Sequence, residues 1–182
     1  NHQGVIMKAQ PFQYSSLIEL AERAERKAKA MEAANSAAAR IAARPLFIAL
    51  DGITDPQNLG AVIRSAAAFG ANGVILPAAH MPVARVVNLT KAIEALKERG
   101  YYSVGLDGGG SALVGETGFE TDPLVIVLGS EGKGLSRLTR EACDCIAGIP
   151  MSNAVESLNA SVAAGIAMYA ADRARREAAA SE

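Results

Sequence analysis

The sequence predicts an α/β fold in which a parallel sheet is flanked by helices on both faces. From residue 45 onward, short apolar runs alternate with helical patterns, and turn-forming residues bound each run. Strands that are apolar almost throughout are typical of parallel sheets, because both faces of such a sheet are buried. The chain has 182 residues, which is enough for one core and short for two.

Five apolar runs are expected to form the strands. They span residues 46–51, 73–77, 101–107, 123–129 and 145–151. Helical patterns occupy residues 58–69, 89–99, 134–142 and 158–176. Ligands of such sheets bind outside the carboxyl ends of the strands, so the loops that follow the strands are the expected place for a functional site.

Residues 1–44 differ in texture and are expected to be a linker remnant followed by a surface helix. Residues 15–43 are rich in Ala, Glu, Arg and Lys, with Ser16 and Glu19 spaced as a capping box and Pro45 as the helix stop. The apolar stripe is thin, and acidic and basic residues are mixed. This pattern favours a surface helix over a basic partner-binding helix.

The composition is that of an ordinary globular protein. Half of the residues are apolar, 20% are charged and the formal net charge is −1, which argues against binding nucleic acid by bulk charge but leaves a local basic patch open. No apolar run is as long as a membrane span, so no membrane partner is expected. Cys143 and Cys145 are expected to be buried, reduced thiols of a cytoplasmic protein. His2 and His80 are too few and too far apart to suggest a metal site.

The segment after the first strand contains Asn58 and Arg64. Asp55 and Pro56 indicate a turn, and Asn58 is well placed to cap the helix that follows. Arg64 lies off the apolar stripe, with Gly60 one turn earlier on its own face. Helix side chains lean toward the N-terminus, so the missing Cβ leaves room for the guanidinium to fold toward the loop. A solvated surface Arg is the simpler interpretation, but a helical Gly costs on the order of 1 kcal/mol, which indicates a reason for its presence.

Residues 127–136, VLGSEGKGLS, look at first like a phosphate-binding loop but do not fit one. A P-loop has four residues between its first Gly and its Gly-Lys-Ser/Thr end, whereas two residues separate Gly129 from Gly132. No hydroxyl residue follows Lys133, and the Glu131 carboxylate would repel phosphate. An ATPase is therefore disfavoured. A tight turn explains the glycines but not the Glu-Lys pair, so the loop suits a ligand that is recognised through backbone groups.

The third stretch leads from the last strand into the last helix. The strand ends at Ile149 and Met151, and Ser157, Leu158 and Asn159 open the helix. Either Ser157 or Asn159 is expected to be the N-cap, and two such side chains are more than a cap needs. Small residues of this helix would allow a close approach within the fold or across a dimer; they are Ala160, Ala163, Ala164 and Ala167.

These three stretches together resemble the signature motifs of the SpoU-type (TrmH-like) RNA ribose 2′-O-methyltransferases of the SPOUT superfamily. The pattern N-L-G-x-x-x-R matches residues 58–64, G-S-E-G-x-G matches 129–134 and S-L-N-x-S matches 157–161. The similarity runs from about Pro45 to Arg176, and three motifs in register are specific. The chain is most similar to the bacterial members that methylate a guanosine ribose in 23S ribosomal RNA, particularly the actinobacterial ones.

The resemblance implies that residues 45–182 form a catalytic domain with a deep C-terminal trefoil knot, a known exception to unknotted folds. It implies a homodimer with its active site beside the subunit interface, and S-adenosyl-L-methionine as the cofactor. The implied cofactor-binding residues are Leu106, Gly129, Ile149, Met151, Ser157, Leu158 and Asn159. The implied catalytic residues are Asn58, Arg64, Glu131, Ser157 and Asn159. Arg64 would orient the 2′-hydroxyl and the adjacent phosphate, Ser157 and Asn58 would fix its guanidinium, and Glu131 would anchor the loop or Arg64.

The chain also departs from the family pattern at two places. Members usually carry an N-terminal RNA-binding domain that resembles ribosomal protein L30e, and residues 1–5 look like the end of the linker that follows it. Relatives have a loop rich in Ser, Thr, Ala and Arg near Pro77 and Ala78. We expect that a mobile domain and a mobile loop are omitted from this sequence and that both contact RNA.

Three functions stay open on these residues. The leading one is methylation of ribosomal RNA, and the second is methylation of transfer RNA, which the motifs do not separate. The third is a catalytically silent RNA-binding or assembly module, against which the complete motifs argue. Lys133, Arg137 and Arg140 are either contacts to the RNA backbone or solvated charges of a helix face.

Overall fold

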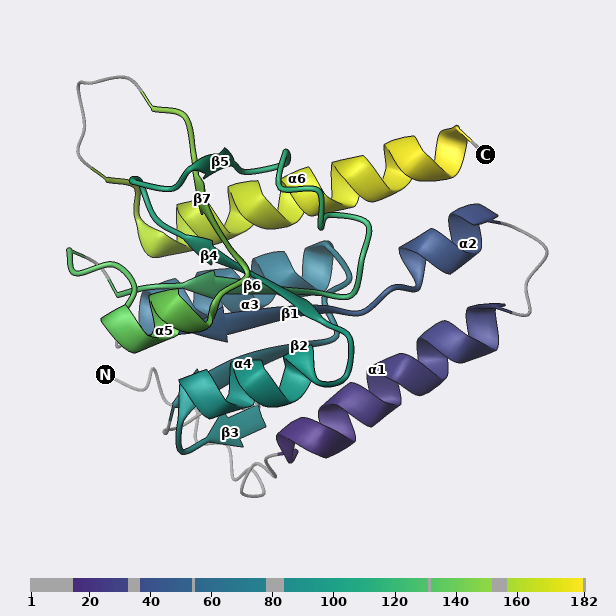
Figure 1. Ribbon diagram of the computed structural model, residues 1–182, viewed down its shortest axis with the longest axis horizontal. Coiled ribbons are helices and arrows are strands. Elements are labelled where there is room, and N and C mark those ends of the chain that lie inside the picture. Colours follow the sequence, from purple (N-terminus) through teal and green to yellow (C-terminus); the bar gives the residue numbers. More distant parts are fainter. Residues whose placement is uncertain are drawn as a thin grey trace, which may run out of the picture.

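The computed structural model describes residues 15–32, 37–53, 55–77, 84–130, 132–151 and 157–181. Within these residues, a seven-stranded sheet has the order β3-β2-β1-β6-β4-β7-β5, and all of its strand pairs are parallel (Figure 1). The strands are β1 (Leu46–Leu50), β2 (Gly73–Pro77), β3 (Ala84–Val86), β4 (Tyr102–Leu106), β5 (Ala112–Leu113), β6 (Leu124–Leu128) and β7 (Cys145–Gly148). The helices are α1 (Leu17–Glu32), α2 (Ala37–Ala42), α3 (Pro56–Ala68), α4 (Leu89–Lys97), α5 (Arg137–Ala142) and α6 (Ala160–Ala180).

The predicted α/β class and its parallel sheet are confirmed. All five expected strands are present, and the sheet contains two more, β3 and β5, at its two edges. These edge strands have three and two residues, which is too short to show a periodicity in the sequence. The knot implied by the resemblance concerns the chain after β7, where residues 152–156 lie outside the described part, and it stays a prediction.

Both faces of the sheet are covered, which explains why the central strands are apolar at every position. Leu46, Ile48 and Leu50 of β1 pack in one core cluster with α3 and α6. Phe47 and Ala49 point the other way, into a second cluster with α1 and α4. Figure 1 shows α6 (yellow) on one side of the sheet and α1 and α4 (purple and teal) on the other. Successive residues of a strand alternate between faces, so a strand between two helix layers has no solvated side.

The N-terminal segment forms α1 and α2, and residues 33–36 of the single helix predicted over 15–43 lie outside the described part. The capping box at the start of α1 is confirmed. The Glu19 amide donates to Ser16 Oγ, and the Ser16 amide donates to Glu19 Oε2, each at 3.1 Å. Helix α1 lies directly against β2, because a Cβ at Gly73 would overlap the side chain of Leu20.

The N-cap of α3 corrects the prediction made for Asn58. Asp55 caps this helix, and its Oδ1 accepts a hydrogen bond from the Gln57 amide at 3.0 Å. Pro56 occupies the first helical position, where its ring fixes φ near the helical value, so the helix begins two residues before Asn58. Asn58 is left inside the first turn with only 8% of its surface exposed.

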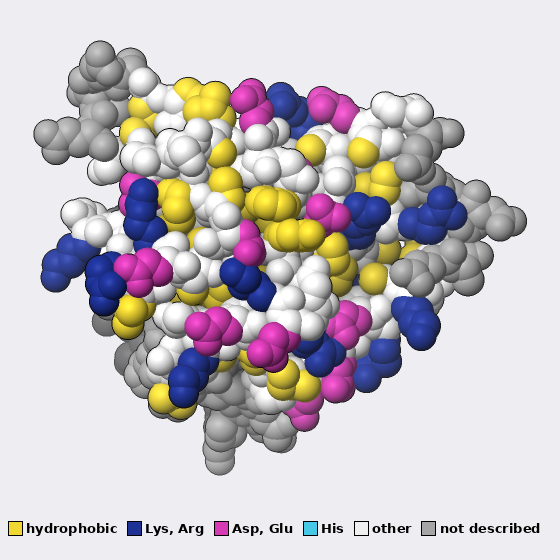
Figure 2. All heavy atoms as spheres, viewed as in Figure 1, with side chains coloured by type: hydrophobic (Ala, Val, Ile, Leu, Met, Phe, Trp, Pro, Cys, Tyr) yellow, Lys and Arg dark blue, Asp and Glu magenta, His cyan; other side chains and the backbone are white. Residues whose placement is uncertain are grey.

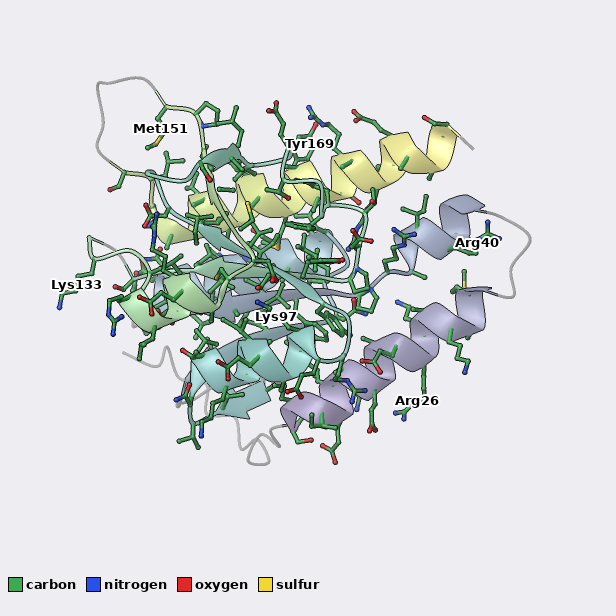
Figure 3. All side chains as sticks on the ribbon, in the orientation of Figure 1. Arg26, Arg40, Lys97, Lys133, Met151 and Tyr169 are labelled. Atoms are coloured by element: carbon green, nitrogen blue, oxygen red, sulfur yellow. The ribbon has the colours of Figure 1, made fainter. Side chains whose placement is uncertain are left out.

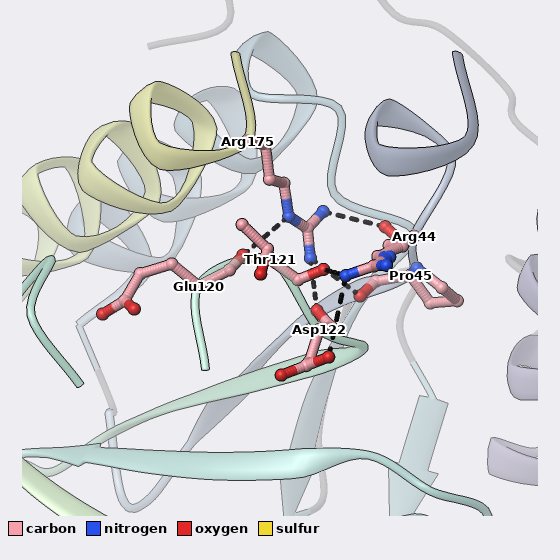
Figure 4. A network of polar contacts seen from close by, with 6 residues as sticks. All are labelled: Arg44, Pro45, Glu120, Thr121, Asp122 and Arg175. Carbon is pink, nitrogen blue, oxygen red and sulfur yellow. Dashed lines mark hydrogen bonds and ion pairs between the residues drawn. The ribbon is translucent and has the colours of Figure 1, made fainter. Parts of the chain in front are cut away.

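The C-terminal helix is anchored by Arg175, which is 8% exposed. Its guanidinium donates to the carbonyls of Glu120, Arg44 and Asp122 at 2.8–2.9 Å and to that of Pro45 at 3.3 Å (Figure 4). Burial lowers the pKa of Arg175 to about 10. These bonds tie α6 to the start of β1 and to the loop before β6.

The small residues of α6 serve packing within the fold. Ala164 and Ala167 are buried in the core cluster that contains the sheet, and Ala160 is buried in the first turn of the helix. A different face of the helix has apolar side chains that are exposed to solvent, namely Val162, Ile166 and Tyr169. Among the helices of the described part, none is both long and apolar enough to cross a bilayer.

The two cysteines are free thiols and are partly buried, where full burial was expected. Cys143 Sγ donates to the Thr139 carbonyl at 3.2 Å. Burial raises the pKa of the Cys143 thiol to about 12, which keeps it protonated at neutral pH.

Candidate active site

A cavity of about 520 Å³ opens beyond the carboxyl ends of β4, β6 and β7. Its walls are the loops that follow these strands and the first turn of α6. This is the edge of the sheet at which the sequence predicts a ligand. The cavity is lined by all seven residues that the resemblance assigns to the cofactor, namely Leu106, Gly129, Ile149, Met151, Ser157, Leu158 and Asn159. Figure 3 shows Met151 and Lys133, which also lines the cavity, at the end of the molecule away from Arg40.

The loop after β6 forms one wall, and its glycines have a steric cause. Ser130 and Gly134 exchange two backbone hydrogen bonds of 2.9–3.0 Å, which close the loop on itself. A Cβ at Gly129 would overlap the backbone of Gly134, so only glycine fits there. Gly132 and Gly134 have φ values of 75° and 66°, which favour glycine. Glu131 lies outside the described residues.

Helix α5 continues from this loop and begins at Arg137, three residues after the predicted start. Ser136 is its N-cap, and the Ser136 amide donates to Asp51 Oδ2 at the end of β1, at 2.9 Å. Two of the three basic residues weighed as RNA contacts have acidic partners here. Arg137 lies 2.8 Å from Glu141, and Arg140 lies 2.7 Å from Asp107.

Asp107 is a lining residue that the sequence analysis missed. It directly follows β4, and its side chain is 27% exposed. Its Oδ2 forms an ion pair with Arg140 Nη1 at 2.7 Å, and its Oδ1 accepts a hydrogen bond from the Gly109 amide at 2.9 Å. The signal that was available is its position, because a carboxylate directly after a parallel strand lies at the ligand-binding edge of the sheet.

Asn159 is the N-cap of α6, as one of the two interpretations at this helix start predicts. Its Oδ1 accepts from the amides of Ser161 and Val162 at 2.9 and 3.4 Å. The helix begins at Ala160, so Ser157 precedes the cap and lines the cavity. Asn159 Nδ2 donates to Asn58 Oδ1 at 2.9 Å, which joins the first motif to the third.

Arg64 lies on α3 with its side chain exposed. A Cβ at Gly60 would lie 3.7 Å from Arg64 Nη1, so the guanidinium folds back over Gly60 as predicted. Arg64 and Asn58 are not among the residues that line the cavity. The structure therefore brings Ser157 and Asn159 into the cavity, connects Asn58 to it through Asn159, and places Arg64 on the neighbouring helix.

The sequence matches the model of the SpoU rRNA Methylase family over residues 45–81 and 78–169. A protein of Mycobacterium ulcerans named "Uncharacterized tRNA/rRNA methyltransferase" is 42% identical over an alignment of 193 residues, gaps included. The alignment covers 96% of this chain and 57% of that protein. The chain belongs to the SpoU rRNA Methylase family. It spans little more than half the length of the curated relative.

Solved structures of SpoU proteins have the same fold. The SpoU methyltransferase AviRb from Streptomyces viridochromogenes, crystallised in complex with the cofactor AdoMet, is 34% identical with a TM-score of 0.65, over 72% of this chain and 58% of AviRb. The TrmH/SpoU tRNA modifying enzyme of A. aeolicus is 25% identical with a TM-score of 0.68, over 88% of this chain and 86% of that enzyme. In this SpoU-family chain the cavity is formed by the second and third motifs, the end of β4 and the segment that follows β7.

Proposed function

We propose that this chain transfers a methyl group from S-adenosylmethionine to a ribose 2′-hydroxyl in RNA. The observation that carries the proposal is the cavity, which gathers the seven expected cofactor residues from four separate segments. The complex of AviRb with AdoMet supports the choice of cofactor. The family match begins at residue 45, which supports a catalytic domain over residues 45–182 with the preceding residues as a linker and surface helix.

The cavity suits this cofactor in size and chemistry. About 520 Å³ lies within the range of small-molecule sites, roughly 300–1,000 Å³. Leu106, Ile149 and Leu158 offer apolar side chains for an adenine ring together with backbone groups for its polar edge. Gly129 offers backbone without a side chain. When bound, S-adenosylmethionine supplies an electrophilic methyl group on a positively charged sulfur.

The chain must orient the acceptor hydroxyl and provide for the loss of its proton. Arg64 is suited to orientation, because a guanidinium offers a planar fork of donors that can hold a hydroxyl and the adjacent phosphate together. Its five N–H donors suit this role, and Arg64 is exposed, where a substrate can reach it. The hydroxyl proton would pass to the adjacent RNA phosphate or to a deprotonated Arg64.

Asn58 and Asn159 act as positioning residues in this scheme. Their hydrogen bond of 2.9 Å joins α3, which carries Arg64, to the start of α6, which lines the cavity. Because both partners are neutral amides, the bond fixes geometry without placing a charge beside the cofactor. The distance between the acceptor-orienting group and the methyl donor depends on this contact.

The proposed substrate is a guanosine of 23S ribosomal RNA, following the motif resemblance. A transfer RNA substrate is the second candidate, because the A. aeolicus tRNA modifying enzyme matches over 88% of this chain. On the face seen in Figure 2, Lys and Arg side chains are interspersed with Asp and Glu, so that face has no region of one charge sign large enough to suggest either RNA. Lys133, exposed at the cavity, is a local candidate for a phosphate contact.

A homodimer is proposed with α6 at the subunit interface. Val162, Ile166 and Tyr169 recur at helical spacing on one face of α6 and are 37–55% exposed. The Tyr169 ring lies edge-on to Phe69, the C-cap of α3, with centroids 6.2 Å apart, so the apolar strip continues toward the end of α3. The strip begins at Val162, next to Ala163 of the cavity wall, which would place the active site beside the interface. Light scattering of the chain and of an Ile166→Glu variant measures the oligomeric state. A dimeric wild type and a monomeric variant would support the proposed interface, and a monomeric wild type would contradict it.

Calorimetric titration and methyl transfer test the function itself. The chain should bind S-adenosylmethionine near one per subunit and should not bind ATP, the control ligand. Radiolabelled methyl transfer into purified ribosomal and transfer RNA then separates the two substrates, and nuclease mapping identifies the ribose. Cofactor binding by the full-length protein without transfer to any RNA would favour the silent RNA-binding module instead.

A further inference from the structure

Asp107 brings a carboxylate into a cavity that otherwise offers mostly backbone and apolar groups. In the described part of the chain, the charged side chains that line the cavity are those of Asp107 and Lys133. Lys133 is on the loop after β6 and is exposed, whereas Asp107 directly follows β4, inside the edge of the sheet. Asp107 belongs to none of the three motifs, so the motifs do not explain a carboxylate at this place in the cavity.

The Asp107 carboxylate is held in one orientation. Arg140 Nη1 lies 2.7 Å from Oδ2, and the Gly109 amide donates to Oδ1 at 2.9 Å. A Cβ at Gly134 would come within 3.4 Å of Oδ2, and one at Gly109 within 3.4 Å of Oδ1, so the neighbouring backbone approaches it closely from two sides. Each carboxylate oxygen can accept about two hydrogen bonds. After these contacts each oxygen can still accept one more from a ligand.

The ion pair selects the kind of ligand group. Arg140 offsets the charge of Asp107, so the pair has little attraction for a cationic centre such as a sulfonium or an ammonium. It still offers strong acceptor oxygens to neutral donors. Acidic residues at this edge of other α/β sheets accept hydrogen bonds from the hydroxyl groups of a nucleotide ribose.

We propose that Asp107 is a cofactor-binding residue that accepts hydrogen bonds from the ribose hydroxyl groups of the adenosine part of S-adenosylmethionine, while Arg140 neutralises its charge. This inference rests on the proposed function, because it assumes that the cavity holds this cofactor. It adds a side-chain contact to a site that the motifs describe through backbone groups. It also gives Arg140, which lies outside the cavity lining, the function of neutralising Asp107 in place of an RNA contact.

The test compares ligand affinities by calorimetry in the whole 182-residue chain and in Asp107→Ala. The ligands are S-adenosylmethionine, S-adenosylhomocysteine and the 2′-deoxy and 3′-deoxy forms of S-adenosylhomocysteine. Wild type should lose about tenfold or more in affinity for at least one deoxy form, as expected for a hydrogen bond to a charged acceptor. Asp107→Ala should lose a similar factor for S-adenosylhomocysteine and should bind that deoxy form as wild type does, within about threefold.

Arg140→Gln is the matched control, because it breaks the same ion pair at a residue outside the cavity lining. It should keep the discrimination against the deoxy form. Equal loss of discrimination in both variants would overturn the inference, since Asp107 would then act only by holding the loop. A loss in Asp107→Ala for S-adenosylmethionine but not for S-adenosylhomocysteine would also overturn it, because the carboxylate would face the sulfonium.

Folding is monitored by thermal unfolding without ligand, and Asp107→Asn replaces the alanine variant if that variant does not fold. Wild-type affinities in every variant would reject the ribose contact and leave the proposed function standing. If the wild-type chain itself does not bind S-adenosylmethionine, the proposed function fails, and the two failures are thereby distinguished.

Discussion

Asn159 Nδ2 donates a hydrogen bond of 2.9 Å to Asn58 Oδ1 across a sequence separation of 101 residues. The bond connects the N-cap of α6 with the first turn of α3. One helix supplies part of the cavity wall, and the other carries Arg64. A contact between two neutral side chains thus links the helix that carries the expected acceptor-orienting residue to the wall of the cavity.

Asn58→Ala removes the acceptor of this bond from a position that is 8% exposed. We expect the free energy of unfolding to fall by about 0.5–1.5 kcal/mol, the typical net contribution of one intramolecular hydrogen bond. Cofactor affinity should fall as well, because the start of α6 is no longer held. Denaturant unfolding and calorimetry measure both. Gln57→Ala, at the exposed neighbouring position, is the control, and equal effects in the two variants would contradict the role of the bond.

Arg64→Ala is expected to abolish RNA methylation, a loss of about a hundredfold or more, because it removes a donor that acts on the reacting group. Cofactor affinity should stay within a few-fold, since Arg64 does not line the cavity. Stability should not change, because the side chain is exposed. Arg64→Lys should restore little activity, as an ammonium lacks the bidentate fork. Loss of cofactor binding in Arg64→Ala, measured by calorimetry, would refute the assignment.

Gly129→Ala is expected to force open the loop after β6, because the new methyl group would overlap the backbone of Gly134. The expected destabilisation is about 1–3 kcal/mol, as for other overpacked sites. Cofactor affinity should fall by about tenfold or more, which is ~1.4 kcal/mol. Gly165→Ala is the matched control, because a Cβ there meets only Ser65 Oγ at an ordinary 3.8 Å. Equal melting temperatures and equal cofactor affinities of the two variants would contradict this role of Gly129.

Glu120 is expected to make stability depend on pH. Burial alone would raise the pKa of Glu120, but hydrogen bonds from Thr117 and Gly118 outweigh it and hold the pKa below the usual value of a glutamate. A carboxyl group with a lowered pKa contributes stability that is complete above its unfolded pKa and is lost as the pH falls through its folded pKa. Glu120→Gln should therefore be less stable than wild type at pH 7, by about 1–2 kcal/mol, and this gap should narrow below pH 4.

Denaturant unfolding at the two pH values measures this gap. The control is Glu116→Gln, an exposed glutamate of the same loop. A gap between Glu120→Gln and wild type that stays constant from pH 7 to pH 3.5 would show that ionisation of Glu120 is not the source of the stability.

Local patterns in the chain were sufficient for the sheet and its covering helices. The run LVIVL of β6 is apolar at every position, and the structure buries all five residues between two helix layers. The same holds for Ser16 and Glu19, whose capping box involves neighbours three residues apart. Such features are predictable because both interaction partners lie within a few residues of each other in the sequence.

Other features depended on how distant segments meet. Helix α3 begins at Pro56, so Asn58 is not its N-cap. The side-chain oxygen of Asn58 instead accepts a hydrogen bond from Asn159. Asp107 and Arg140 form an ion pair across 33 residues, and no local sequence pattern around either residue predicts this pairing. The residues of the cavity come from four segments, and their order along the chain does not predict how close these segments lie in space.

The motifs and apolar runs of the sequence therefore determined the fold class, the edge of the sheet that holds the site, and the residues expected there. The tertiary structure alone decided which of these residues touch, that Asp107 joins them, and that Arg64 approaches from α3 outside the cavity lining. The reason is physical. The periodicity of apolar residues is a local property of a chain, whereas a contact across 101 residues exists only after the sheet has brought its strand ends together.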